Sequence, residues 1–420
     1  MATIIDNSTE KMLTRTLIAG VDSGEYDIDD SMKELENLCE AGDLQVVCQV
    51  VQKKDNPENK YYLGEGKMAE VKELCHNNQV ELCVFDCELT GSQIKNISDF
   101  LEIEVIDRTM LILEIFSKRA TTAEGKLQTE LALLKYQLPR LSGMGASLSR
   151  QGGGIGSRGP GESKLETDRR HLKEKISALE SRLKELEENR AVMRAKRDRS
   201  AIPKIGIVGY TNAGKSMLLN KLTGAGVLSE NKLFATLDAT TRKAELPTGE
   251  SVLFTDTVGF IRKLPHHLVR AFKSTLDEVC YSDLLLIVSD INDSEVAEHI
   301  KVTEQVIEEL GAAEKPRLYV YNKCDIYGGV LNKSNTEKAI YISAKTGEGI
   351  DVLLESIANE LSHLKCNYKL LIPYDRQTVV NALYANYTVI STEYVDNGVL
   401  VEATLDERGH GMYRDLIIEQ

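Results

Sequence analysis

The sequence of 420 residues has no long apolar run and no cysteine pair with C-x-x-C spacing. No segment approaches the roughly 18 consecutive apolar residues that a membrane-spanning helix needs. The first residues show no basic stretch followed by an apolar one, so we expect no secretory signal. None of the eight cysteines forms a C-x-x-C pair, and most lie in apolar runs. These absences favour a cytosolic (cytoplasmic) protein with reduced, structural thiols. Cys83, Cys87 and His76 could be proposed as metal ligands, but core packing is the favoured interpretation.

Positive charge is in the minority, with 51 Lys and Arg residues against 65 Asp and Glu residues and a net charge of −14. It is also unevenly distributed. Residues 117–200 hold 19 basic and 11 acidic residues, a net charge of +8, which leaves −22 for the rest of the chain. An acidic protein that concentrates its positive charge in one segment suggests a polyanionic partner for that segment. The alternative is an ordinary solvated helical face.

A phosphate-binding loop is predicted near the middle of the chain. The apolar, β-branched run Lys204–Val208 leads directly into Gly209–Ser216, which reads G-x-x-x-x-G-K-S, and leucines at helical spacing follow. A strand, a glycine loop and a helix N-terminus in this order place backbone N–H groups and the positive end of a helix dipole around an anion. Lys215 is expected to reach the terminal phosphates and Ser216 to ligate Mg²⁺. The alternative is a glycine turn before an ordinary helix.

Three later motifs, D-x-x-G, N-K-C-D and Ser343–Lys345, each follow an apolar strand and complete a guanine-nucleotide site. In D-x-x-G, Asp256 can hold Mg²⁺ through water, and the N–H of Gly259 can meet a γ-phosphate. In N-K-C-D, Asp325 can accept hydrogen bonds from both N1–H and the exocyclic amino group of guanine. Adenine has neither donor on that edge, and the unpaired carboxylate would cost about 1.5–3 kcal/mol or more. The predicted contacts outside the first switch are Gly209, Tyr210, Thr211, Asn212, Ala213, Gly214, Lys215, Ser216, Asp256, Thr257, Val258, Gly259, Asn322, Lys323, Cys324, Asp325, Ser343, Ala344 and Lys345.

The remaining patterns predict an α/β chain of four domains. They are an N-terminal α/β domain (1–115), an antiparallel helical hairpin (116–200), a doubly wound P-loop GTPase domain (201–364) and a small α+β domain (365–420). Leucine stripes with four-three spacing predict the hairpin. Residues 141–163 between its helices hold eight glycines in 23 residues and form a mobile, basic tip, or simply a flexible linker. Gly64–Lys67 looks like a fragment of a phosphate loop, but a turn before a helix is the better interpretation.

From about Tyr61 to His363 the chain resembles the HflX family, ribosome-associated GTPases of the Obg-HflX group. The resemblance is carried by Val105–Thr109, Glu124–Gln128, Gly153–Glu162, Leu165–Arg170 and the second switch, from Asp256 to His266. It also extends to the first switch, whose residues are Phe234, Ala235, Thr236, Leu237 and Asp238. The resemblance implies that Thr236 is the second protein ligand of Mg²⁺ beside Ser216. It implies hydrolysis of GTP to GDP that depends on Lys215, Thr236 and Gly259.

The same resemblance implies a monomeric factor that binds the large ribosomal subunit and splits stalled or vacant ribosomes under stress such as heat. The hairpin and its glycine-rich loop would contact ribosomal RNA. Phe260 stands where related GTPases carry a water-orienting glutamine, so slow intrinsic turnover and an activating partner are expected. Two alternatives stay open. One is a GTPase switch with a non-ribosomal partner, and the other is an RNA-remodelling module with an ATP-using N-terminal domain.

Overall fold

The computed structural model describes residues 13–24, 26–141, 164–197, 202–224, 233–234, 239–263, 273–328, 339–363 and 366–419. The chain divides into two compact units. The first contains residues 1–183 and two short later segments, 230–235 and 264–272, and the second contains the rest. No helix in the described ranges is both long and apolar enough to cross a membrane.

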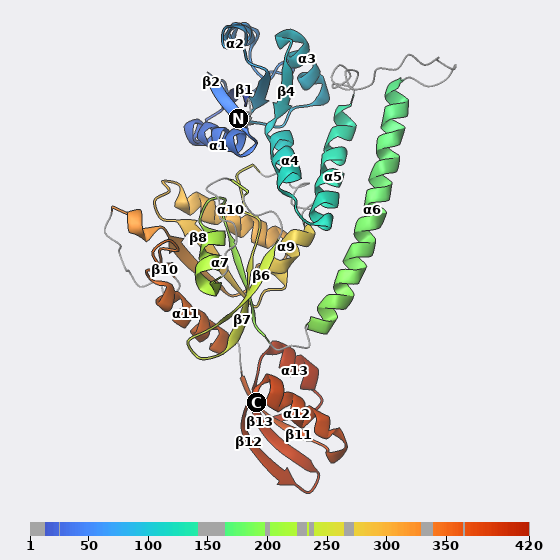
Figure 1. The fold of residues 1–420 in the computed structure, drawn as a ribbon, viewed down its shortest axis with the longest axis vertical. Helices are drawn as coiled ribbons and strands as arrows, with labels where there is room; N and C mark the ends of the chain where they lie inside the picture. Colours follow the sequence, from blue (N-terminus) through green and yellow to red (C-terminus); the bar gives the residue numbers. More distant parts are fainter. Residues whose placement is uncertain are drawn as a thin grey trace, which may run out of the picture. The chain divides into compact units, whose positions relative to one another are not determined.

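The first unit begins with a parallel four-stranded sheet in the order β2-β1-β3-β4 (Figure 1). The side chains of β1 alternate between its two faces, and helices cover both, because an all-parallel sheet is stable only when both faces are buried. Leu17 and Ala19 pack with α2 and α3, whereas α1 and α4 contact each other. The elements are β1 (Thr14–Asp22), α1 (Ile28–Ala41), β2 (Leu44–Lys53), α2 (Glu65–Asn77), β3 (Leu82–Phe85), α3 (Gly91–Leu101), β4 (Glu104–Asp107) and α4 (Arg108–Arg119).

Helices α5 (Ala123–Gln137) and α6 (Lys164–Arg197) follow and run in opposite directions (Figure 1). The short 3-10 helix η1 (Leu138–Arg140) contains Pro139, which lacks the N–H needed to continue α5. Along the pair, the predicted leucine stripes meet, since Leu134, Ile176 and Leu179 are buried together. Two ion pairs, Lys135–Glu180 and Lys175–Glu130, join the helices. Apart from Leu141, the glycine-rich stretch 141–163 lies outside the described residues.

The second unit contains a six-stranded sheet in the order β10-β9-β8-β5-β7-β6, parallel except for the edge strand β6. Helices α7 and α11 pack on one core cluster of this sheet, and α9 and α10 also contact its strands. This is the predicted doubly wound fold, with β5 in the middle of the sheet. Its elements are β5 (Lys204–Gly209), α7 (Lys215–Thr223), β6 (Thr240–Glu245), β7 (Ser251–Asp256), α9 (Lys273–Cys280), β8 (Leu284–Asp290), α10 (Val296–Glu309), β9 (Arg317–Asn322), η3 (Cys324–Ile326), β10 (Ala339–Tyr341) and α11 (Ile350–His363).

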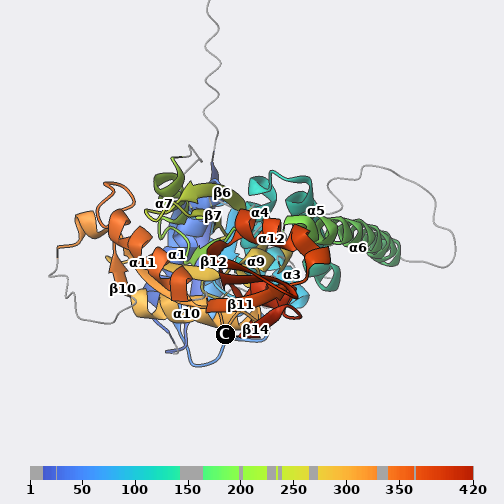
Figure 2. The same cartoon turned by 90° about the horizontal axis from the view of Figure 1, so that it is seen from below.

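The C-terminal part is an antiparallel sheet in the order β12-β13-β11-β14 with helices packed against it (Figure 2). Leu383 of α12 and Tyr413 of α13 pack on Leu370, Ile372 and Val401. The domain has the α+β composition that the sequence predicted. The elements are β11 (Cys366–Ile372), η4 (Tyr374–Arg376), α12 (Gln377–Asn386), β12 (Thr388–Val395), β13 (Gly398–Leu405), α13 (Glu407–Tyr413) and β14 (Ile417–Glu419).

Candidate functional site

The predicted phosphate loop leaves the carboxyl end of β5 and enters α7, in the expected order. Two of its positions require glycine. Gly209 has φ 148°, and a Cβ there would lie 2.1 Å from the carbonyl oxygen of Val288. Gly214 has φ 92°, and a Cβ there would lie 2.3 Å from Nδ2 of Asn322. The glycines therefore allow a left-handed backbone and also the close approach of β8 and of the N-K-C-D segment.

Lys215 and Ser216 lie beside Asp256, as the phosphate and magnesium chemistry requires. The Lys215 ammonium is buried and donates to the carbonyl oxygen of Tyr210 at 2.7 Å. Burial lowers the pKa of Lys215 to about 8, partly opposed by the Asp256 carboxylate. Ser216 Oγ donates to Asp256 Oδ2 at 2.6 Å, so two oxygen atoms of the kind that Mg²⁺ prefers lie together. Thr211 Oγ1 is buried without a hydrogen-bond partner in the described part of the chain. These groups fit a phosphate anion and Mg²⁺.

The second switch lies directly on the phosphate loop. Thr211 N donates to Phe260 O at 2.8 Å, and Phe260 N donates to Gly209 O at 3.1 Å. A Cβ on Gly259 would lie 3.0 Å from Lys215 Nζ, so the Gly259 backbone stands beside the ammonium group. Thr257 Oγ1 donates to Ile207 O at 2.8 Å, which fixes the start of the second switch to β5. Val258 is buried. The ring of Phe260 is only 1% exposed, so it contributes packing rather than a polar contact.

The base-recognition residues meet at the ends of β9 and β10. Ser343 Oγ donates to Asp325 Oδ1 at 2.7 Å and so orients the carboxylate predicted to read guanine. Asn322, buried at the end of β9, donates through Nδ2 to Ala213 O at 2.8 Å and accepts from Ala344 N at 2.9 Å. The Asn322 amide therefore joins the phosphate loop to the base loop. This scaffolding contact is invisible in the sequence, because the two loops are more than a hundred residues apart.

The other residues of the base loops are spread between core and surface. Lys323 has φ 65°, and its ammonium pairs with Asp290 at 2.8 Å. Burial raises the pKa of the neighbouring Cys324 thiol. Lys345 is exposed. In the phosphate loop, Asn212 has φ 62° and is exposed, whereas Ala213 is buried.

Of the first switch, only Phe234 falls within the described residues, and Ala235, Thr236, Leu237 and Asp238 lie outside them. Phe234 has φ 54° and is buried. Its ring packs edge-on against Phe116 of α4, with ring centroids 4.6 Å apart. Both phenylalanines belong to the first unit.

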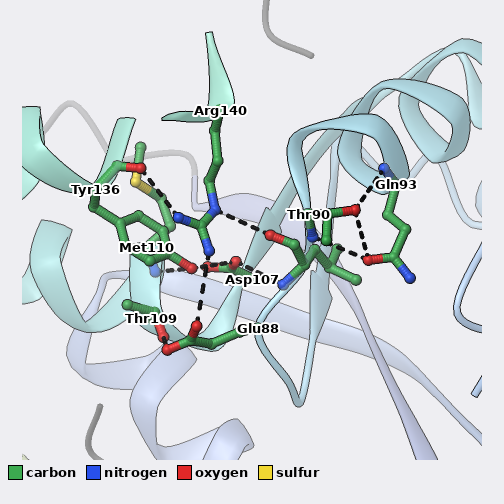
Figure 3. Close-up of polar contacts among 9 residues, drawn as sticks. Glu88, Thr90, Gln93, Asp107, Thr109, Met110, Tyr136 and Arg140 are labelled. Carbon is green, nitrogen blue, oxygen red and sulfur yellow. Dashed lines mark hydrogen bonds and ion pairs between the residues drawn. The ribbon is translucent and has the colours of Figure 1, made fainter. Parts of the chain in front are cut away.

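The predicted RNA-binding hairpin is anchored to the N-terminal sheet by a buried polar cluster (Figure 3). The Asp107 carboxylate, at the end of β4, accepts from Leu89 N at 3.0 Å, from Met110 N at 2.8 Å and from Tyr136 Oη at 2.5 Å. The Arg140 guanidinium lies over the Tyr136 ring, 3.6 Å from its centroid, and its Nε donates to Leu89 O at 3.0 Å. The end of α5, where the glycine-rich segment begins, is thereby fixed to the sheet.

A close backbone approach completes this anchor. A Cβ on Gly91 would lie 3.0 Å from Arg140 Cα, so the absent side chain gives η1 room to pack closely against the start of α3. Thr90 caps α3 by accepting from Gln93 N at 3.3 Å, while its own N–H donates to Gln93 Oε1 at 2.9 Å (Figure 3). Arg140 also forms an ion pair with Glu88 at 3.8 Å. None of these partners was predicted.

The fragment Gly64–Lys67 is a turn before a helix, as the favoured interpretation held. Gly64 is the N-cap of α2 with φ −67°, and its N–H donates to Gln52 Oε1 at 2.8 Å. Lys67 pairs with Glu70 at 2.8 Å on the same helix. The Gly64 N–H, which would be the first backbone donor to a phosphate, is therefore already bound to the Gln52 side chain. Cys83, offered as a metal ligand, is fully buried, and no group of three or more metal-ligating side chains occurs in the described ranges.

Four family models match the chain. Their descriptions are GTP-binding GTPase N-terminal (residues 29–117), GTP-binding GTPase Middle Region (119–197), 50S ribosome-binding GTPase (204–323) and HflX C-terminal domain (330–412). The curated "GTPase HflX" of Caldanaerobacter subterraneus subsp. tengcongensis is 49% identical over 389 residues, which cover 93% of this chain and 90% of that protein. The chain belongs to the HflX family of GTPases.

The chain is also similar to a second HflX GTPase and to a solved GTP-binding protein. The GTPase HflX of Escherichia coli K12 is 42% identical over 350 residues, 82% of each chain. A solved structure of a GTP-binding protein from Sulfolobus solfataricus in complex with GDP is 27% identical and covers 84% of this chain and 100% of that chain, with a TM-score of 0.45. As a member of the HflX family, the protein binds guanine nucleotides and hydrolyses GTP. The roles of individual residues stay predictions.

Proposed function

We propose that this HflX-family GTPase binds the large ribosomal subunit and uses GTP to split stalled or vacant ribosomes. The observation that carries the proposal is the distribution of charge. Residues 117–200 carry a net charge of +8 in a chain of net charge −14, and they coincide with the hairpin. A basic helical pair suits the phosphates of ribosomal RNA, with an affinity that falls steeply as salt displaces counterions. The match of residues 204–323 to a family described as 50S ribosome-binding GTPases supports the same partner.

The nucleotide chemistry follows from the site described above. In this proposal Ser216 and Thr236 ligate Mg²⁺, Lys215 neutralises the terminal phosphates and the N–H of Gly259 meets the γ-phosphate. Magnesium supplies charge neutralisation at the phosphates when bound. Asp325, oriented by Ser343, selects guanine. The protein acts as a monomer in the cytoplasm.

Hydrolysis is proposed to be incomplete without a partner. Phe260 occupies the position of a water-orienting side chain, and its buried ring has no hydrogen-bonding group. Purified large subunits should therefore raise turnover, on the order of the 10³–10⁵-fold that a missing catalytic group is worth in other GTPases. Fast hydrolysis by the isolated protein, with no rise on adding subunits, would contradict the proposal. A rise with a different partner and none with ribosomes would favour the non-ribosomal alternative.

The glycine-rich loop offers a sharper test of splitting. Replacing residues 152–159 with a Ser/Ala segment of equal length should leave nucleotide binding intact. Splitting, followed by light scattering, should fall more than ribosome binding, because the helices retain the phosphate contacts and only the tip loses its close backbone approach. If this variant splits ribosomes at the wild-type rate, the segment acts only as a linker. ATP turnover that depends on residues 1–200 would instead support the remodelling alternative.

A further inference from the structure

Tyr210, the second residue of the phosphate loop, is the centre of a network that joins this loop to the second switch and to α10. Its hydroxyl oxygen accepts a hydrogen bond from the backbone N–H of Arg262 at 2.7 Å. Its ring stacks on the imidazole of His299, with centroids 3.7 Å apart and planes only 10° from parallel. A bulky aromatic side chain is not needed to wrap a phosphate, since backbone N–H groups do that. The contacts of Tyr210 indicate a different task.

Further contacts fix the two partners of Tyr210, His299 and Arg262. His299 Nδ1 lies 2.9 Å from Asp293 Oδ2, and this hydrogen bond contributes most to a lowered pKa of Asp293. The guanidinium of Arg262 forms an ion pair with Glu295, immediately before α10. Tyr210 is only 7% exposed, so its ring is fixed between the loop and the helix. Side chains on and just before α10 therefore support both Tyr210 and the switch residue that it binds.

The position of Gly259 depends on this arrangement. Phe260 is paired with the phosphate loop through the two backbone hydrogen bonds to Gly209 and Thr211, and the Arg262–Tyr210 bond secures the chain two residues further on. Together these contacts set the Gly259 backbone beside the Lys215 ammonium. A group that must meet a developing charge contributes most when it is already in place.

We propose that Tyr210 is a positioning residue for GTP hydrolysis: supported by the His299 ring, its hydroxyl holds the second switch so that Gly259 faces the γ-phosphate. The inference rests on the proposed role of Gly259 but not on the ribosomal function. It is therefore tested with the protein alone, and a failure of the ribosomal proposal would leave the result unchanged.

The test compares single-turnover GTP hydrolysis and GDP affinity in the full-length protein. Tyr210→Phe keeps the ring stack and removes the acceptor of the Arg262 N–H. Its rate of hydrolysis should fall about five- to tenfold, as expected for one lost hydrogen bond, while its Kd for GDP changes less than twofold. His299→Ala removes the stack and should reproduce this pattern, and His299→Phe, which retains a stacking ring, should recover most of the rate. Tyr319→Phe is the matched control, since that hydroxyl donates to Glu304 away from the switch.

The contrary outcomes are equally specific. Wild-type rates in Tyr210→Phe and His299→Ala would overturn the proposal. A loss of GDP affinity as large as the loss of rate would also overturn it, because Tyr210 would then only shape the nucleotide pocket. Gly259→Ala provides the remaining check. A Cβ there would lie 2.9 Å from Thr211 Cα, so this variant should displace the Gly259 N–H. If it hydrolyses GTP normally, the placement of that N–H is not needed, whatever the Tyr210 variants show.

Discussion

The hydroxyl of Tyr136, near the end of α5, donates a hydrogen bond to the buried carboxylate of Asp107, at the end of β4, across 2.5 Å. This contact links the hairpin to the N-terminal sheet through a titratable group. Burial raises the pKa of Asp107 above its usual 3.8, and the Tyr136 hydroxyl acts in the opposite direction by favouring the ionised form. The strength of the link should therefore depend on pH.

Tyr136→Phe should weaken the junction more at neutral than at acidic pH. The lost hydrogen bond stabilises ionised Asp107, so its contribution is present above the folded-state pKa and disappears as Asp107 becomes protonated. We expect a loss of about 1.5–3 kcal/mol at pH 7 and a smaller loss as the pH falls toward 4, measured by hydrogen exchange of the α5 and β4 amides. Tyr26→Phe is the control, because its hydroxyl donates to the neutral carbonyl of Val21. Equal losses at both pH values would contradict the account.

Asp325→Asn should change base preference. The amide keeps the shape of the carboxylate but no longer offers two acceptor oxygens, so guanine should lose about 1.5–3 kcal/mol, roughly 10- to 150-fold in affinity. Xanthine nucleotides should gain, because their extra oxo group can pair with the new amide. Competition between GTP and XTP measures both. Ser343→Ala, which removes only the orienting donor, should weaken GTP slightly without improving XTP. If the affinity for GTP is unchanged and XTP does not bind, Asp325 is not the residue that recognises guanine.

The affinity for GTP should fall as the pH rises above 8. The pKa of Lys215 is about 8 without a ligand, and bound phosphates must raise it, so binding takes up a proton between these two values. Each pH unit above 8 should then cost up to about tenfold in affinity. Fluorescent nucleotide titrations from pH 7 to 9 measure the slope. Lys215→Met should bind weakly and lose this slope, whereas any titration of the base itself would persist in the variant. An equal slope in both proteins would refute the prediction.

Thr236→Ala should separate the two nucleotides. A threonine that ligates Mg²⁺ only when a γ-phosphate is present contributes to the GTP-bound conformation and not to the GDP-bound one. GDP affinity should stay within about twofold, while the preference for a non-hydrolysable GTP analogue over GDP falls by about tenfold, on the scale of one charge-assisted contact. Equal losses for both nucleotides would contradict the role given to Thr236.

The sequence predicted the fold best where local patterns were strong. The four nucleotide motifs are regular, and the pattern of residues 1–115 was sufficient to predict the N-terminal α/β domain in which α1 (Ile28–Ala41) lies. Helix α4 was missed because eight of its twelve residues are buried, so it lacks the one-sided apolar stripe that marks a surface helix. Helix α13 was missed because Gly409 and Gly411 lower its helix propensity.

Contacts between distant segments could not be predicted in this way. The motif reading assigned Asn322 to the nucleotide, but its amide also bridges two loops. Tyr210 was predicted only as a nucleotide contact, whereas its ring stacks on His299 of α10 and its hydroxyl binds the second switch. Tyr136 binds Asp107 and Arg140 binds Leu89. No sequence motif links these segments, so the contacts could not be predicted. Such partners depend on the tertiary fold, which a single sequence does not display.

The length of α6 has a mechanical consequence. Its 34 residues form one continuous helix, which at 1.5 Å per residue is about 51 Å long. One end follows the glycine-rich segment, and only six residues separate the other end, Arg197, from β5. A tilt of about 10° at the β5 end would carry the far end of a rod this long through about 9 Å. A continuous rod of this length would turn a small tilt at one end into a displacement at the other end that is wider than a base pair is thick.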